Sequence, residues 1–148
     1  MIEEERGAVV IREAIGADVP ALTELIAQWG YPAQPAVVAA RLQRVTGETD
    51  AVLVAVAASG VVGWVHVGLY STLATDNAAQ VLGLVVDTSK RRQSIGRQLM
   101  ESAEAWARER GCHALYLRTR LSRRGAHAFY KRLGYRQIKT SLTFVREL

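Results

Sequence analysis

Hydrophobic and polar positions in the first third of the chain follow a strand-like and then a helix-like spacing. The run from Ala8 to Arg12, rich in β-branched residues, predicts a strand, and apolar residues then recur every three or four positions behind Asp18, which is expected to cap a helix. The segment from Gly30 to Pro32 interrupts this periodicity, and a second helical pattern runs from Pro35 to Gly47. We therefore expect one strand followed by two helices.

The middle of the chain carries three apolar runs that predict strands. Two valine-rich runs, Ala51 to Ala57 and Val61 to Tyr70, are separated by Ala58 to Gly60 and form a hairpin pattern. The third run, Gln80 to Val86, contains Gly83, and a glycine inside a strand often marks a bulge or a close backbone approach. We expect an antiparallel pair followed by an irregular third strand.

The last third of the chain continues the alternation of helices and strands. Residues from Ser94 to Gly111 have helical spacing, Ala114 to Leu117 predicts a buried strand, and Gly125 to Leu133 predicts a helix. Tyr135 to Val145 predicts one or two final strands. The whole order indicates a mixed α/β sheet with helices on its faces, in a single domain over residues 1–148.

Composition limits the class of protein. Of the 148 residues, 49% are hydrophobic and 22% are charged, which is ordinary for a globular chain. The longest apolar stretch, Ala51 to Val67, is broken by polar and glycine residues, so no membrane span is predicted. The acidic first residues lack the layout of a secretory signal, so we expect a cytoplasmic location. Cys112 is the only cysteine, which argues against a disulfide framework or a multi-cysteine zinc site, and no metal is predicted.

Positive charge is concentrated in one part of the sequence. Residues 88–136 hold thirteen of the nineteen Lys and Arg residues but only three of the fourteen acidic residues. This distribution predicts a basic face, which suits nucleic acid, a polyphosphate cofactor or an acidic partner. Charge alone does not choose among these three.

A cationic loop joins the third predicted strand of the middle region to the helix that starts near Ser94. The first turn of a helix leaves backbone N–H groups unsatisfied and carries partial positive charge, and Gly96 allows a ligand to approach the backbone closely. Arg91, Arg92 and Arg97 add charge around those amides, and the planar guanidinium binds two phosphate oxygens at once. The loop therefore predicts a phosphate site, although a solvated loop has the same composition.

Two motifs in this region resemble one known family. The run from Arg91 to Gly96 is similar to the Arg-x-x-Gly-x-Gly/Ala signature that binds acyl-CoA in the GNAT superfamily, with Ser94 in place of the first glycine. The run from Ala126 to Tyr135 resembles the Ala-x-x-Phe-Tyr-x-x-x-Gly-Phe/Tyr helix of the same family. Neither a Gly-x-Gly-x-x-Gly motif nor a P-loop is present. On these motifs the chain is identified as a member of the GNAT superfamily of acyl-CoA-dependent N-acetyltransferases.

The resemblance implies a mostly antiparallel central sheet with splayed middle strands and helices on both faces. Acetyl-CoA would lie in the opening between the splayed strands, as a co-substrate. A bulge at Gly83 would turn a neighbouring amide toward the thioester carbonyl and stabilise the tetrahedral oxyanion. The residues that the resemblance assigns to acetyl-CoA are Leu84, Val85, Val86, Arg91, Arg92, Gln93, Ser94, Ile95, Gly96 and Arg97.

The resemblance also implies direct attack of a primary amine on the thioester, through a tetrahedral intermediate. Tyr130 matches the tyrosine that acts as the acid toward the CoA sulfur, with core packing as its other interpretation. Where many relatives have a glutamate base, this chain has Gln80, which does not accept a proton. The base is therefore unassigned, with His66 and His127 as candidates that also have structural interpretations.

The acceptor is expected to be a small-molecule amine or a peptide N-terminus. The region that grips the acceptor in the family carries an aromatic set here, for which core packing is the alternative: Trp29, Tyr31, Trp64, His66 and Tyr70. A non-catalytic acyl-CoA sensor is the alternative to an enzyme, nucleic acid is a less favoured partner, and a membrane partner is not expected. The tail from Leu142 to Val145 would permit a homodimer.

Overall fold

The computed structural model describes residues 8–91 and 94–148. The chain divides into two compact units, residues 1–118 and 119–148, and each unit is described by itself. The larger unit contains the sheet and its helices. The smaller unit contains one helix and the C-terminal segment.

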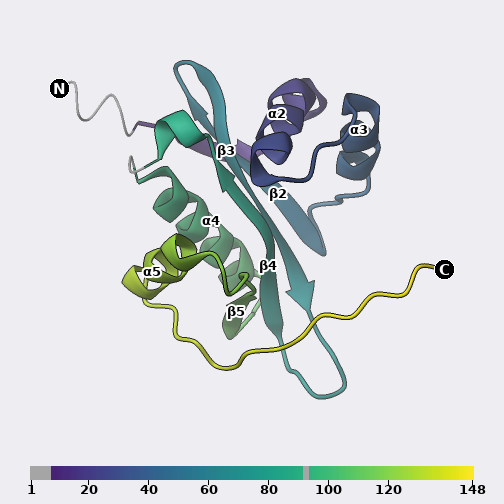
Figure 1. Cartoon of the computed structure of the whole chain (residues 1–148), viewed down its shortest axis with the longest axis vertical. Helices are drawn as coiled ribbons and strands as arrows, with labels where there is room; N and C mark the ends of the chain where they lie inside the picture. The colour runs from purple at the N-terminus through teal and green to yellow at the C-terminus, as the bar shows by residue number, and fades with distance from the viewer. Residues whose placement is uncertain (1–7, 92–93) are drawn as a thin grey trace. The chain divides into compact units, whose positions relative to one another are not determined.

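A five-stranded sheet forms the centre of the larger unit (Figure 1). Its strands, in spatial as well as chain order, are β1 (Val10–Glu13), β2 (Asp50–Ala57), β3 (Gly60–Tyr70), β4 (Ala78–Val86) and β5 (Ala114–Leu117). The first three pairings are antiparallel and the pairing of β4 with β5 is parallel. This confirms the expected mixed, mostly antiparallel sheet, and the predicted hairpin is the β2–β3 pair.

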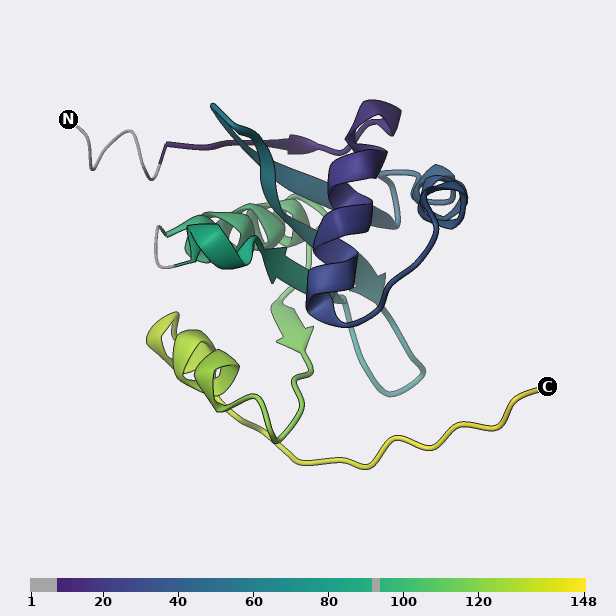
Figure 2. The same ribbon diagram turned by 45° about the horizontal axis from the view of Figure 1, so that its top comes forward.

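Helices cover both faces of this sheet (Figure 2), as expected. The longer helices are α2 (Val19–Trp29), α3 (Pro35–Gln43) and α4 (Ile95–Glu109), and two short 3-10 turns are η1 (Gly16–Asp18) and η2 (Thr88–Lys90). Helices α2 and α3 lie on one face and α4 lies on the other. Helix α3 ends at Gln43, before the predicted end at Gly47. The amide of the C-cap residue, Arg44, donates to the carbonyls of Arg41 and Leu42, and not to the carbonyl four residues before it, as a helical amide would.

Two apolar layers hold the sheet between these helices. The layer under α2 and α3 consists of Val19, Leu22, Leu25, Val38, Val54, Trp64 and Val85. On the opposite face, the apolar stripe of α4 is fully buried at Leu99, Met100 and Ala103. Burial of a large aliphatic side chain contributes about 1.5–3 kcal/mol, so the two layers together fix how the strands and helices of this unit pack.

Asp18 stands at the start of α2, but it does not cap that helix as predicted. Its carboxylate accepts hydrogen bonds from Nη1 and Nη2 of Arg12, at 2.8 and 2.9 Å, and from the amide of Ile15 at 2.8 Å. Asp18 has no side-chain hydrogen bond to the amides of α2. The carboxylate faces β1 because two charged hydrogen bonds to a guanidinium are stronger than one bond to a helix amide.

The smaller unit contains α5 (Arg124–Arg132), which Gly134 ends with a left-handed backbone conformation (φ 94°). The predicted final strands between Tyr135 and Val145 are wrong, because this segment is irregular in the structure. A strand needs a partner for its backbone groups, and the unit of residues 119–148 contains no strand. Accordingly, Leu142, Phe144 and Val145 are exposed.

None of the helices in residues 8–91 and 94–148 has the length and apolar character that crossing a membrane requires.

Candidate active site

The second half of β4 has a free edge. Strand β5 pairs with β4 only from Ala78 to Val81, and β5 ends at Leu117, opposite Val81. From Gly83 to Val86, β4 pairs with β3 alone among the described strands. The backbone groups on the β5 side of this stretch are therefore available to a ligand.

The register of the β3–β4 ladder identifies which residues offer those groups. The amide of Asp87 donates to the carbonyl of Val62 at 2.8 Å, which makes this a hydrogen-bonded pair. Such pairs alternate with non-hydrogen-bonded pairs in an antiparallel ladder, so Val85 directs its amide and carbonyl toward Trp64 of β3. Leu84 and Val86 therefore direct theirs to the free edge. Three strand residues were predicted to contact the cofactor. Leu84 and Val86 present backbone groups to the free edge, whereas Val85 contributes its side chain to the core.

A bulge interrupts this ladder at Leu82. His66 pairs with Gly83, but the next residue, Val67, pairs with Val81, so Leu82 is an extra residue on β4. The predicted irregularity at Gly83 is thus confirmed, within one position. A bulge bends its strand and leaves one residue outside the ladder, here at the point where β4 leaves β5.

Gly83 lies under two tryptophan rings. A Cβ atom at this position would lie 2.7 Å from Cη2 of Trp64 and 3.1 Å from Cη2 of Trp29. These rings are edge-to-face, with centroids 5.6 Å apart, and Tyr31 adds a further ring 4.8 Å from Trp29. The glycine is needed here because the aromatic rings fill its side-chain space.

The loop after β4 begins with a fixed turn. The Asp87 carboxylate accepts hydrogen bonds from the amide and the hydroxyl of Ser89, at 2.9 and 2.8 Å, and these bonds hold its pKa below the usual value. The side-chain oxygen of Gln28, near the end of α2, accepts a hydrogen bond from the amide of Thr88 at 3.1 Å. The chain is thereby held where it leaves the sheet.

The same loop ends at the N-terminus of α4. Ser94 has a left-handed backbone conformation (φ 61°, ψ 9°) that glycine adopts more readily. The first helical hydrogen bond runs from the amide of Gln98 to the carbonyl of Ser94, at 3.0 Å. The amides of residues 95–97 precede this bond and have no acceptor within the described part of the chain. Ile95 is buried and anchors the turn, Gly96 is half-buried, and Arg97 is exposed.

Arg91 is exposed on the loop just before this helix. Arg92 and Gln93, also predicted to bind the cofactor, lie outside the described residues. With two exposed guanidinium groups and the free amides of its first turn, this end of α4 provides the donors that a pyrophosphate needs.

On the face of the sheet covered by α2 and α3, His66 makes a hydrogen bond to a carboxylate. Its Nε2 atom lies 2.9 Å from Oδ2 of Asp50, and the two side chains are 27% and 24% exposed. Register places Val52 opposite His66 and Val54 opposite Trp64, so these residues share one face with Asp50. Sequence reasoning found His66 but not Asp50, which lies one residue before the predicted strand.

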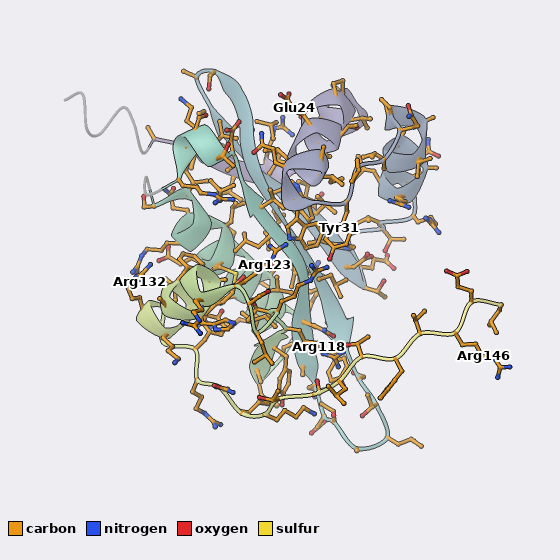
Figure 3. All side chains as sticks on the ribbon, in the orientation of Figure 1. Glu24, Tyr31, Arg118, Arg123, Arg132 and Arg146 are labelled. Atoms are coloured by element: carbon orange, nitrogen blue, oxygen red, sulfur yellow. The ribbon has the colours of Figure 1, made fainter. Side chains whose placement is uncertain are left out.

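The aromatic set expected to grip an acceptor divides into two groups. Trp29, Tyr31 and Trp64 lie together above Gly83. Figure 3 shows Tyr31 on the connection between α2 and α3. Tyr70 is opposite Ala78, at the other end of β3, and its ring is 5.9 Å from that of Tyr116. Only the first group borders the bulge.

Tyr130 belongs to the smaller unit. Its ring is 5.1 Å from that of Phe129 and 6.1 Å from that of Tyr135. Burial raises the pKa of its phenol, and the charge of Arg123 opposes this rise in part. The phenol is therefore protonated at neutral pH, as an acid must be. Figure 3 shows Arg123 and Arg132 at opposite ends of α5.

The other residues considered as a base, His127 and Gln80, are less suited to that role than His66, and a metal site is not found among the described residues. His127 has its Nε2 atom 2.8 Å from the carbonyl of Arg120. Gln80 pairs with Gly68 and Tyr116, and its amide does not accept a proton. Within residues 8–91 and 94–148, no group of three or more His, Cys, Asp or Glu side chains is arranged to hold a metal ion.

Comparison with known families gives one match over most of the chain. The model of the Acetyltransferase (GNAT) family matches residues 19–135. This range contains β2 to β5, α2 to α5 and the whole loop between β4 and α4.

A curated acetyltransferase and a solved structure are also similar to this chain. An aminoalkylphosphonate N-acetyltransferase from Salmonella typhimurium is 45% identical over 58 residues, which are 39% of this chain and 38% of that protein. The chain thus matches well under half the length of this curated relative. A transcriptional regulator from Bacillus halodurans C-125 superimposes with a TM-score of 0.84 at 26% identity, over 94% of this chain and 100% of the other.

An aminoglycoside N-acetyltransferase in complex with CoA has the same fold. It superimposes with a TM-score of 0.84 at 15% identity, over 95% of this chain and 96% of the other.

Proposed function

The chain belongs to the GNAT acetyltransferase family, and from this premise we propose that it transfers the acetyl group of acetyl-CoA to a primary amine. The acceptor is a small molecule or a peptide N-terminus. The amine attacks the thioester directly, through a tetrahedral intermediate, with no covalent acyl-enzyme. The observation that carries this proposal is that the free edge of β4 is followed along the chain by the N-terminus of α4, where Gly96 is half-buried and Arg97 is exposed.

The free edge suits the pantetheine arm of acetyl-CoA. This arm contains two amides, and an extended chain with amides binds an exposed strand edge as an added strand would. Leu84 and Val86 offer the backbone groups for this pairing, by the register of the ladder. Val85 supports the site from the core, since this residue is only 5% exposed.

The first turn of α4 suits the pyrophosphate. Its amides carry the partial positive charge of the helix dipole, and Arg91 and Arg97 add full charges beside them. Ser94 takes the left-handed conformation that the family's glycine would adopt there, and its hydroxyl accepts a hydrogen bond from Gln98 at 3.2 Å. Arg92 and Gln93 complete the predicted cofactor set in the sequence.

The bulge at Leu82 supplies the place for the acetyl group. An amide that leaves the ladder there would face the thioester carbonyl and stabilise the oxyanion. Tyr130 would then give a proton to the leaving sulfur, and its raised pKa keeps that proton available. We propose that residues 1–148 form one acetyltransferase domain, and the family match over residues 19–135, which includes parts of both units, supports this.

The relatives suggest which amines to test. An aminoalkylphosphonate carries one amine and one anionic group, whereas an aminoglycoside carries several amines. Asp50 is the one acidic side chain described on the strand face beside the aromatic group, and it is engaged by His66. We favour a monoamine over a polycationic acceptor on this ground.

The experiment measures acetyl-CoA binding by isothermal titration and turnover as free thiol release. The acceptor panel contains an aminoalkylphosphonate, an aminoglycoside, arylalkylamines and peptides with free N-termini. Binding with turnover of at least one amine supports the proposal. Binding without turnover on the panel would favour a non-catalytic acyl-CoA sensor, and absence of binding would contradict the acetyl-CoA site.

A further inference from the structure

His66 faces the interruption of the β4 ladder. Its register partner on β4 is Gly83, the residue that follows the extra residue Leu82. Leu82 is 50% exposed, and its side chain extends over Gly68, beside Asp50, so it lies on the same face as the histidine. His66 is thus one strand away from the proposed acetyl position, a spacing of about 4.8 Å between backbones.

The hydrogen bond to Asp50 determines which nitrogen of His66 can accept a proton. An ionised carboxylate only accepts hydrogen bonds, so the proton of the neutral imidazole is on Nε2, at 2.9 Å from Oδ2 of Asp50. The lone pair is then on Nδ1. Within the described residues, the bond to Asp50 is the only hydrogen bond of this side chain, which is 27% exposed. Nδ1 therefore has no hydrogen-bond partner among the described residues, on a side chain that is partly exposed.

We propose that His66 is the general base of the acetyl transfer and that Asp50 is its positioning residue. This inference rests on the proposed function, and it supplies the base that the substitution of glutamate by Gln80 leaves unassigned. It also locates the acceptor: the amine binds on the face of the sheet under α2 and α3, beside Trp29, Tyr31 and Trp64.

The proton inventory of the reaction is complete with these groups. The acceptor enters as an ammonium ion, R–NH₃⁺, and gives one proton to Nδ1 of His66, directly or through a water. The lone pair of the free amine nitrogen forms the C–N bond, and the π electrons of the thioester carbonyl move to its oxygen. When these electrons form the C=O bond again, the C–S bond breaks and its electrons leave with the sulfur as a thiolate. The second N–H proton passes to the thiolate by way of the general acid, the role proposed above for Tyr130, and His66 releases its proton to solvent, so the products are an amide, a free thiol and one proton.

The surroundings of His66 hold few other groups that titrate. Asp50 of β2 is the ionisable group in contact with it. Leu82 and Gly83 of β4 do not titrate, and Trp64 of its own strand does not either. On the helices that cover this face, α2 carries Glu24 and α3 carries Arg41, both exposed, and Tyr31, after α2, packs on Trp29. A pH effect that disappears with the imidazole is therefore attributable to His66.

The pair also has a purely structural interpretation, as a polar cross-strand contact on a half-exposed face. The two interpretations differ in what substitution does. Loss of a structural contact lowers stability and leaves the pH dependence of turnover unchanged. Loss of a base lowers turnover and removes the decline at acidic pH, because a protonated imidazole cannot accept the ammonium proton.

The test compares wild type, His66→Gln, Asp50→Asn, Asp50→Glu and the control His113→Gln, which replaces an exposed histidine just before β5. Each variant is examined by thermal unfolding, by titration with acetyl-CoA and by thiol release from pH 5.5 to 9 with an amine that the wild type acetylates. We expect His66→Gln to bind acetyl-CoA normally and to lose about 10²-fold or more in kcat/KM. The pH profile of this variant should lack the decline in turnover at acidic pH. His113→Gln should match the wild type.

Substitutions at Asp50 provide an independent test of the proposal. Asp50→Asn should lower kcat more than it raises KM, and Asp50→Glu should recover part of the loss because a carboxylate is restored. A His66→Gln variant that folds and turns over like the wild type, with the same acid limb, would overturn the inference while leaving the proposed function intact. If His66→Gln does not fold, equal kcat in Asp50→Asn and wild type would overturn it. Absence of turnover in the wild type would overturn the proposed function and, with it, the assignment of a base.

Discussion

The six-membered ring of Trp64 occupies the space in which a side chain at Gly83 would stand. A Cβ atom there would meet Cη2 and Cζ3 of this ring at 2.7 and 2.8 Å. Trp64 is 6% exposed and packs in the layer under α2, so it has little room to move. The two residues together fix the strand at the bulge where the acetyl group is proposed to bind.

Gly83→Ala should therefore lower stability and turnover together. The added methyl group displaces Trp64 or β4, and overpacking of this kind costs about 1–3 kcal/mol. Urea unfolding measures the first effect and thiol release the second. Gly16→Ala is the matched control, since nothing lies within 4 Å of a Cβ there, and it should change stability by less than about 0.5 kcal/mol. Equal stability of the two variants would refute the close-contact explanation.

Ser94→Gly should stabilise the protein, because Ser94 has φ 61° and glycine adopts this conformation without strain. The gain is about 1 kcal/mol at most, since glycine also makes the unfolded chain more flexible and the hydroxyl contact with Gln98 is lost. Ser102→Gly, inside α4, makes the same chemical change and should destabilise by about 0.5 kcal/mol. Thermal unfolding distinguishes them. Destabilisation by both substitutions would show that the conformation at Ser94 costs nothing.

Asp18→Asn should destabilise the larger unit in a pH-dependent manner. The hydrogen bonds from Arg12, followed by the bond from the Ile15 amide, lower the pKa of Asp18. Its stabilisation is therefore complete above the unfolded-state value of about 3.9 and is lost as pH falls through the folded-state value. We expect a deficit of about 1–3 kcal/mol at pH 7 that shrinks below pH 4. Urea titrations of both proteins at several pH values measure it, and a deficit independent of pH would contradict the ionic explanation.

Tyr130→Phe should lower kcat by about 10²-fold and leave acetyl-CoA affinity unchanged, because the phenol is proposed to protonate the leaving sulfur. Burial raises the pKa of Tyr130, so the wild type should keep this phenol protonated at neutral pH. Tyr116→Phe is the control, with the same loss of a hydroxyl from a ring that packs on Tyr70. Thiol release by both variants provides the measurement. Undiminished turnover in Tyr130→Phe would remove this residue from the mechanism.

Local patterns in the sequence predicted most of the fold correctly. Helix α4 follows from the spacing of its buried residues, and the bulge on β4 was indicated by one strand glycine. The final strands were predicted wrongly, because β-branched residues near Phe144 have strand propensity but no partner strand in their unit. Propensity is local, whereas pairing depends on the surroundings.

The site was predictable only where its residues are consecutive. The loop from Arg91 to Gly96 could be predicted because its motif is local in the sequence. The roles of Leu84, Val85 and Val86 could not be predicted in this way, because the register against β3 decides which of them faces the free edge. The contact between His66 and Asp50 joins residues 16 positions apart, and only the pairing of β2 with β3 brings them together.

Amide hydrogen exchange followed by NMR, with and without acetyl-CoA, tests the central claim most directly. In the free protein the amide of Val85 should already be protected, because it faces β3, whereas those of Leu84 and Val86 should exchange faster. Acetyl-CoA should add protection at Leu84, at Val86 and at the first turn of α4, and leave Val85 nearly unchanged. Unaltered exchange at these amides under saturating acetyl-CoA, or new protection confined to other strands, would contradict the proposed site.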